Sequence, residues 1–159
     1  MEQTASYMVF RAGGRNCAVS VSYVLEVTEN DGINPLPGAP GFVVGIKKFR
    51  NEVVPVIDAV KRLAIPKLET SDTPDKYIVI FEINIGSGIK KFGALVDKVL
   101  SVNEIPADSI KVVNEIDSQI SSAAVIKGVV VSEENFIYVL LPEYFFSEKD
   151  LQRLGDIIE

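Results

Sequence analysis

Short apolar runs, separated by glycine, proline, asparagine and aspartate, recur along this chain at intervals of about 8–12 residues. Runs rich in Val, Ile, Tyr and Phe are typical of strands, and this spacing is the pattern of β-barrels and β-sandwiches. The strand-like runs cover residues 7–10, 18–21, 24–27, 42–46, 53–57, 77–85, 92–96, 99–105, 124–131 and 136–141. We therefore predict an all-β fold.

The segments between these runs have the composition of turns and loops. GGRN at 13–16 predicts a tight turn, and residues 30–41, with three prolines and three glycines, predict a long surface loop. KKFRNE at 47–52 predicts a hairpin turn between two strands. AVKRLA at 59–64 favours a short helix that stops before Pro66.

Residues 66–76 are polar and contain prolines, so they are the best candidate for a boundary inside the single domain 1–159. The spacing then suggests two small barrels that share one core region. The first would lie mainly in 12–66 and the second mainly in 77–141, to which the N-terminal strand could also contribute. Pro142 at a first helical turn, followed by alternating charges, predicts a C-terminal helix over 142–156.

The charge balance points to protein partners. With 16 Lys+Arg against 22 Asp+Glu, the net charge is −6. Nucleic-acid binders draw most of their affinity from basic surfaces, and anionic membranes also attract basic segments, so neither kind of partner is expected. No apolar run approaches the ~20 residues of a membrane helix, and the N-terminus lacks the features of a signal peptide. We predict a cytoplasmic protein.

Histidine is absent from the chain and Cys17 is its only cysteine. Serine–histidine or cysteine–histidine catalysis is thereby excluded, and so are internal disulfides. For Cys17, a place in the core is favoured over a reactive thiol, because no base adjoins it. We predict neither a cofactor nor a metal site.

Carboxylates next to strands are the remaining candidates for catalysis, since paired acids can do general acid–base work. They are Asp58, Glu82, Asp97 and Glu104. No acidic cluster accompanies them, so a solvated or capping role is favoured.

Two other motifs have both a structural and a functional interpretation. The glycines of GSGIKK at 86–91 resemble a phosphate loop, but strand-like runs lie on both sides, which favours a hairpin turn. The aromatic triplet at 144–146 is expected to pin the last helix to the body, with a partner-binding patch as the alternative.

The order of these pieces resembles the CheW family of chemotaxis coupling proteins. Five stretches carry the resemblance: SYMVFRAGGRNCAVSVSYVLEV at 6–27, LPGAPGFVVGI at 36–46, FRNEVVPVID at 49–58, FGALVDKVLSV at 92–102, and IKGVVV with FIYVLL near the C-terminus. Each match is weak alone, but five in order at plausible spacing form a fairly specific pattern.

The resemblance implies two intertwined five-stranded SH3-like barrels and a non-enzymatic adaptor. Family members link the cytoplasmic tip of chemoreceptors to the histidine kinase CheA. The first barrel would contact the kinase regulatory domain, and a groove between the barrels would take the receptor helix. A carboxylate enzyme, and a small-molecule-binding or purely structural barrel with a deep apolar cavity, are the alternatives.

The same resemblance implies interface residues by position. They are Val24, Glu26, Gly45, Arg50, Val99 and Val102. The three valines could instead be core residues, and Glu26 a solvated strand position. The family's turn usually reads Arg-Gly, whereas Asn51 follows Arg50 here, and Asn tolerates positive φ. We also predict that Arg50 pairs with Glu26, because a guanidinium can hold a carboxylate through two hydrogen bonds.

Overall fold

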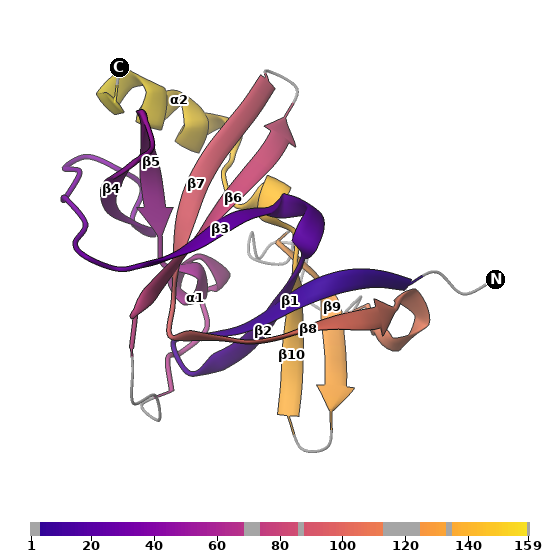
Figure 1. Ribbon diagram of the computed structural model, residues 1–159. Coiled ribbons are helices and arrows are strands. Elements are labelled where there is room, and N and C mark those ends of the chain that lie inside the picture. Colours follow the sequence, from indigo (N-terminus) through magenta and orange to yellow (C-terminus); the bar gives the residue numbers. More distant parts are fainter. Residues whose placement is uncertain (1–3, 69–73, 86–87, 113–124, 133–134, 159) are drawn as a thin grey trace.

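The computed structural model describes residues 4–68, 74–85, 88–112, 125–132 and 135–158. This part of the chain forms ten strands, which are β1 (Thr4–Ala12), β2 (Arg15–Ser20), β3 (Val24–Glu29), β4 (Val43–Phe49), β5 (Glu52–Ile57), β6 (Tyr77–Ile85), β7 (Gly88–Val96), β8 (Lys98–Pro106), β9 (Ile126–Ser132) and β10 (Asn135–Leu140). The strands form two five-stranded sheets (Figure 1). Sheet A has the order β8-β1-β2-β10-β9, and sheet B has the order β3-β6-β7-β5-β4. The predicted all-β fold of two five-stranded barrels is confirmed.

Along the sequence, the strands of sheet B lie between the first two and the last three strands of sheet A. Strands β1 and β2 begin sheet A, strands β3 to β7 make the whole of sheet B, and β8 to β10 return to complete sheet A. The sheets therefore do not follow the division expected at 66–76. The hairpin of β6 and β7 joins β3–β5 because β6 pairs with β3 and β7 pairs with β5, which are contacts between strands distant in sequence.

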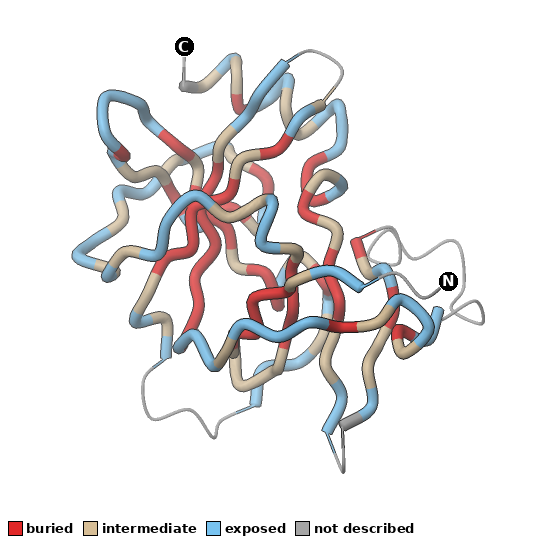
Figure 2. Tube along the Cα trace, turned by 45° about the vertical axis from the view of Figure 1, so that its right-hand side comes forward, coloured by how far each residue is buried: buried red, intermediate tan, exposed pale blue. Residues whose placement is uncertain are grey.

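Continuous apolar runs become strands that are buried on both faces. In β1, Met8 and Phe10 point into a core shared by the two sheets, whereas Tyr7 and Val9 point into the core of sheet A. Successive side chains of a strand face opposite ways, so a run without polar residues fills two cores at once. Strand β6 does the same, with residues 79, 81 and 83 in the shared core and 78 and 80 in the core of sheet B. Figure 2 shows that the buried parts of the chain lie toward the middle of the molecule.

Asp97 occupies the point at which the chain passes from sheet B back to sheet A. Its side chain is fully buried, and its carboxylate accepts hydrogen bonds from the backbone N–H groups of Gly14, at 3.0 Å, and Asp75, at 2.9 Å. Its own N–H donates to the carbonyl of Arg11 at 2.6 Å. One buried carboxylate thus ties the β1–β2 turn and the start of β6 to the junction between the sheets.

The two short-range predictions made for residues 13–16 and 86–91 are confirmed as hairpins. Gly13 and Gly14 lie between β1 and β2 with φ values of 56° and 78°, which suit the two central positions of a type I′ turn. Strands β6 and β7 pair as far as Ile85 and Gly88, so a strand rather than a helix follows the glycines. Gly86 and Ser87 themselves lie outside the described residues, as does the polar segment 113–124.

The predicted short helix is confirmed as α1 (Ala59–Leu63). Asp58 caps it by accepting a hydrogen bond from the N–H of Lys61 at 3.1 Å. Ala64 ends it in the left-handed conformation, with a φ of 58°.

The C-terminal helix begins later than predicted. A 3-10 turn, η4 (Pro142–Tyr144), comes first, and helix α2 covers Glu148–Ile158. Ser147 and Asp150 set this start, because the N–H of each donates to the other's side chain at 3.0 Å. Pro142 does begin a helical turn, but this turn is the 3-10 turn η4 and not the α-helix. Within the described residues, no helix has the length and apolarity needed to cross a bilayer.

The aromatic triplet fixes the segment before α2 to the body. Phe145 and Phe146 are buried, and their ring centroids lie 5.6 and 5.1 Å from that of Phe92 on β7. Tyr144 is 55% exposed and does not take part in this contact. The expected packing role is therefore confirmed for two of the three residues.

Candidate partner-binding surface

Strand β3 stands at one end of sheet B, and strand β8 stands at one end of sheet A. In the described part of the chain, β3 pairs only with β6, and β8 pairs only with β1. No side chain of β3 is buried, and Ile105 is the single buried residue of β8. Each strand thus keeps one backbone edge and most of its side chains free to meet another molecule.

Apolar side chains on these two edges stand in solvent. They are Leu25 and Val27 on β3 and Val99, Leu100 and Val102 on β8, with exposed fractions between 37% and 62%. Proteins usually protect sheet edges with charges, prolines or a covering segment, because a bare apolar edge invites aggregation. Exposed apolar clusters on such edges therefore mark surfaces that partners cover.

Arg50 and Glu26 form the predicted pair. The Arg50 Nη2 and Glu26 Oε1 atoms are 3.4 Å apart, and the guanidinium also lies over the ring of Phe49, 4.8 Å from its centroid. Glu26 belongs to β3 and Arg50 to the β4–β5 turn, so the contact joins the two ends of the strand order of sheet B. Both side chains are largely exposed, and pairs of this kind contribute about 0–1 kcal/mol to stability.

The turn that carries Arg50 is tighter than predicted, and its strained residue is a different one. Strands β4 and β5 continue to Phe49 and Glu52, which leaves Arg50 and Asn51 as the two turn residues. The positive φ, 56°, belongs to Arg50, and Asn51 is not among the described residues with positive φ. A non-glycine residue in this region is strained by about 1 kcal/mol. The arginine is thus held in an unfavourable backbone conformation beside its partner.

Gly45 is buried in β4 because the loop 30–41 crosses directly over it. A Cβ atom at this position would lie 2.1 Å from the carbonyl oxygen of Asn34. The loop is fixed there by two backbone hydrogen bonds between Asn34 and Ile46, at 2.9 and 2.7 Å. This geometry gives Gly45 a packing role, so any influence on a partner would pass through the loop.

The three valines of the predicted site differ in burial. Val24 is half-buried and packs against the shared core, in agreement with the alternative that it is a core residue. Val99 and Val102 are exposed, so the core alternative is wrong for them. The structure therefore brings Glu26 and Arg50 together in sheet B, with Val24 two residues away on β3. Val99 and Val102 lie on the edge of the other sheet.

Sequence reasoning missed Leu25, Val27 and Leu100 on the same two edges. Residues 24–27 were expected to form a half-buried strand, in which one face is apolar. The signal that could have found them is that Leu25 and Val27 alternate onto the face opposite to Val24, so that β3 has apolar residues on both faces although it is not a continuous apolar run. Leu100 follows Val99 in the same way, so β8 also places apolar residues on both faces.

The four carboxylates considered as catalysts lie in environments that a structural or solvated role explains. Asp58 caps α1 and pairs with Lys67 at 2.7 Å, and Asp97 accepts backbone hydrogen bonds. Glu82 is half-buried opposite Lys91, and Glu104 is exposed on β8. No group of three potential metal ligands occurs among the described residues.

Cys17 is completely buried in the shared core. Desolvation raises the pKa of its thiol from 9.0 to about 12, which keeps the thiol protonated and unreactive at neutral pH. The favoured core position of Cys17 is confirmed.

Comparison with known proteins gives one consistent result. A family model described as CheW-like domain matches residues 6–150. Chemotaxis protein CheW of Treponema pallidum is 27% identical over 150 residues, which covers 94% of this chain and 86% of that protein. Chemotaxis protein CheW of Bacillus subtilis is 26% identical over 121 residues, with 76% and 75% of the two chains covered.

A solved structure has the same fold. The crystal structure of the scaffolding protein TtCheW from Thermoanaerobacter tengcongensis superposes with a TM-score of 0.75 at 26% sequence identity. The match covers 93% of this chain and 91% of that one.

Proposed function

Because this chain belongs to the CheW-like domain family, we propose that it is a non-enzymatic adaptor that couples chemoreceptors to the histidine kinase CheA in the cytoplasm. The names of its relatives support a role in chemotaxis, and that of TtCheW supports a scaffolding role. The observation that carries the proposal for this chain is the pair of apolar sheet edges, β3 and β8, which the described part of the chain leaves uncovered.

The receptor would meet the adaptor at these two edges. A receptor tip is a helical structure, and a helix offers a stripe of apolar side chains on one face. Val99, Leu100 and Val102 on β8, with Leu25 and Val27 on β3, supply the complementary apolar side chains. Two rigid barrels hold these groups at a fixed spacing, so a change in the receptor's helix packing alters the fit.

The kinase regulatory domain would meet the barrel of sheet B. The ion pair of Arg50 with Glu26 lies on this barrel and links its first and last strands. We infer that the pair stiffens the receptor-facing strand β3, which carries Glu26, while it contributes little to the free energy of folding. Gly45 would act at the same barrel by seating the loop 30–41.

Signalling requires that the adaptor's affinity for one partner depend on the state of the other. If the adaptor binds one receptor state more tightly when the kinase is in one activity state, the two equilibria are coupled, with a typical coupling free energy of about 1–3 kcal/mol. Each contact can remain weak, since an assembly with many receptors and kinases adds avidity.

Isothermal titration of the chain with the isolated CheA regulatory domain tests the first contact. We expect a Kd below ~100 μM, which corresponds to about −5.5 kcal/mol. A receptor-coupled kinase assay then tests the second contact. Absence of binding at ~100 μM would contradict the adaptor role.

The alternative of a small-molecule-binding module predicted a deep apolar cavity and no kinase binding. The structure does contain a hollow of ligand size, between β5, β7 and α2. This hollow lies apart from β3 and β8, so a ligand there is compatible with an adaptor. Kinase binding in the titration above would exclude the alternative as the sole function.

A further inference from the structure

A hollow of about 390 Å³ lies between β5, the β6–β7 hairpin and α2. This volume falls within the ~300–1,000 Å³ of typical small-ligand sites. None of its lining residues belongs to β3 or β8. The hollow is therefore separate from the proposed receptor edges, although it lies on the barrel of sheet B.

The hollow has a buried apolar floor and an exposed apolar rim. Phe92 and Phe146 meet edge to face at the floor, with centroids 5.1 Å apart, and Leu154 of α2 is buried beside them. Val53 and Ile89 on the rim are 49% and 63% exposed. An apolar ligand could contact large apolar side chains on both the floor and the rim. Each methylene group buried in this way stabilises a complex by about 0.8 kcal/mol.

Gly155 leaves the helical wall of the hollow open. It stands inside α2, where glycine is less favourable than alanine, and a Cβ atom here would meet nothing within 4 Å. Neither a tight turn nor a close neighbour explains this glycine. A side chain of ordinary size would, however, project from a wall of the hollow.

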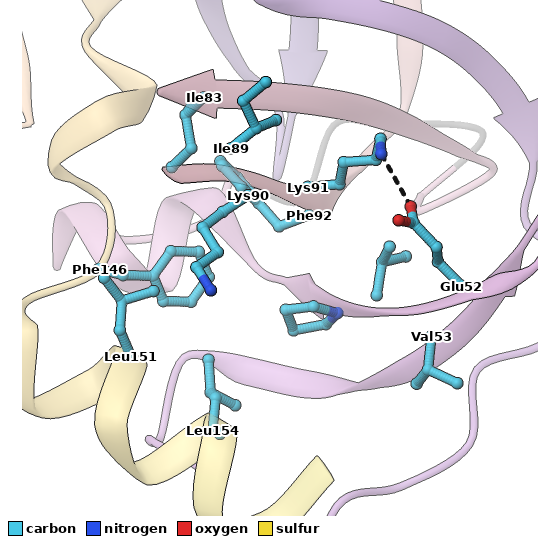
Figure 3. Close-up of a pocket in the computed structure, with 13 residues that line it drawn as sticks. Glu52, Val53, Ile83, Ile89, Lys90, Lys91, Phe92, Phe146, Leu151 and Leu154 are labelled. Carbon is cyan, nitrogen blue, oxygen red and sulfur yellow. Dashed lines mark ion pairs between the residues drawn. The ribbon is translucent and has the colours of Figure 1, made fainter. Parts of the chain in front are cut away.

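The charge at the hollow is positive and unbalanced. Lys91 forms an ion pair with Glu52 at 2.9 Å. Lys90 has no carboxylate within ion-pair distance among the described residues, and its side chain extends toward Phe146 and Leu151 (Figure 3). In a chain with a net charge of −6, an unpaired ammonium group over an apolar floor favours an anionic ligand.

We propose that this hollow binds a small anionic amphiphile, with its apolar body on Phe92, Phe146 and Leu154 and its carboxylate at Lys90. A water molecule occupies ~30 Å³ in the liquid, so the hollow has room for roughly a dozen non-hydrogen atoms. This is the size of a medium-chain or aromatic carboxylate. A neutral ligand would leave Lys90 unpaired.

Octanoate is a suitable probe, with 1-octanol as a neutral analogue and acetate as an anion without a tail. The full-length chain, labelled with ¹⁵N, is titrated with each compound by NMR. We expect octanoate to give saturable shifts at α2 and at 88–92, with a Kd of ~1 mM, a typical value for a ligand of this size. Octanol should bind several-fold more weakly, and acetate should not saturate.

Three variants make the test specific. Lys90→Gln should weaken octanoate binding about 5- to 10-fold, whereas the matched change Lys149→Gln, at an exposed position of α2 outside the hollow, should leave the Kd unchanged. Gly155→Leu should remove binding by occupying the space. Equal effects of the two lysine changes, octanol binding as tight as that of octanoate, or no saturation at ~20 mM would each overturn the proposal.

Discussion

At the scale of single residues, Arg50 combines an unfavourable backbone conformation with a weak ion pair. Its φ of 56° costs about as much as the pair with Glu26 contributes. Stability therefore does not account for this arginine. A directed role, such as holding β3 against the β4–β5 turn for a partner, accounts for the strain better.

A charge exchange tests this role. Glu26→Arg or Arg50→Glu alone should reduce receptor-coupled kinase activation about 10-fold, and the double variant should recover a large part of it. Each single variant should change the free energy of unfolding by less than about 1 kcal/mol, measured in urea. Full activation by both single variants would show that the pair has no role in coupling.

Replacing Arg50 by glycine separates the strain from the charge. Arg50→Gly should be more stable than Arg50→Ala by about 1 kcal/mol, because glycine adopts positive φ freely. Both variants lack the ion pair, so they should reduce coupling equally. A difference in coupling would instead assign the function to the backbone of the turn.

Cys17 gives a pH dependence whose sign follows from its raised pKa. The unfolded thiol loses its proton near pH 9, whereas the folded thiol keeps it up to about pH 12. The stability contributed by the neutral buried thiol is thus present below pH 9 and is lost as the pH rises from about 9 to 12. Between pH 9 and 10 the free energy of unfolding should fall by about 1 kcal/mol more than in Cys17→Ala, as measured by urea denaturation.

At the scale of elements, the crossing between the sheets depends on Asp97. Its carboxylate accepts from two backbone N–H groups, those of Gly14 and Asp75, which belong to different segments. Asp97→Asn should lower the free energy of unfolding by about 3 kcal/mol, because the amide group presents a donor where an acceptor is needed. Urea denaturation measures the loss, and Glu104→Gln on exposed β8 should change it by less than about 0.5 kcal/mol.

Two glycines in different elements should respond in opposite directions to the same substitution. Gly45→Ala drives a methyl group into the carbonyl of Asn34 and should cost about 2–3 kcal/mol, with faster hydrogen exchange at Ile46. Gly155→Ala meets nothing and should stabilise α2 by up to about 1 kcal/mol. Similar losses in both would show that helix packing at Gly155 is tighter than its geometry indicates.

The elements themselves were predictable wherever the signal is local. The strand at 7–10, the glycine turn at 13–16 and the helix capped by Asp58 all follow from neighbouring residues. The pairing of β2 with β10 and of β5 with β7 did not, because parallel backbone hydrogen bonds between distant segments leave no side-chain signature. The start of the C-terminal helix was predicted too early, at Pro142 instead of Glu148. Pro142 starts any kind of helical turn equally well, and the reciprocal cap of Ser147 and Asp150 was overlooked.

The candidate surface could be predicted only in part. Arg50 and Glu26 were paired on the strength of the family resemblance, and residue patterns alone would have left Glu26 solvated. Leu25 and Leu100 were missed because an apolar residue in a strand looks the same whether its face meets the core or solvent. Only the sheet order shows that β3 and β8 are edges.

At the scale of the whole molecule, sheet A ends in two edge strands that allow a matched comparison. Val102 on β8 and Val131 on β9 are 62% and 58% exposed. Val102→Asp should reduce receptor binding at least 10-fold, whereas Val131→Asp should not change it. The free energy of unfolding should fall by a similar, small amount in both variants, because each replaces valine, which favours strands, by aspartate, which does not. Equal losses of receptor binding would contradict a receptor site on β8.

The order in which the two sheets use the chain also determines the order in which they can be completed. Every strand of sheet B lies between residues 24 and 96, so a nascent chain can finish that barrel while the ribosome is still making the rest. Strands β1 and β2 must wait, as an unaccompanied hairpin, for partners more than 75 residues downstream, since β2 ends at Ser20 and β8 begins at Lys98. Such distant contacts slow folding. The barrel of sheet A, whose strands come from both sides of this middle segment, is therefore the last to form, and a translation pause after residue 96 would leave the strands of sheet B paired and the β8 edge still missing.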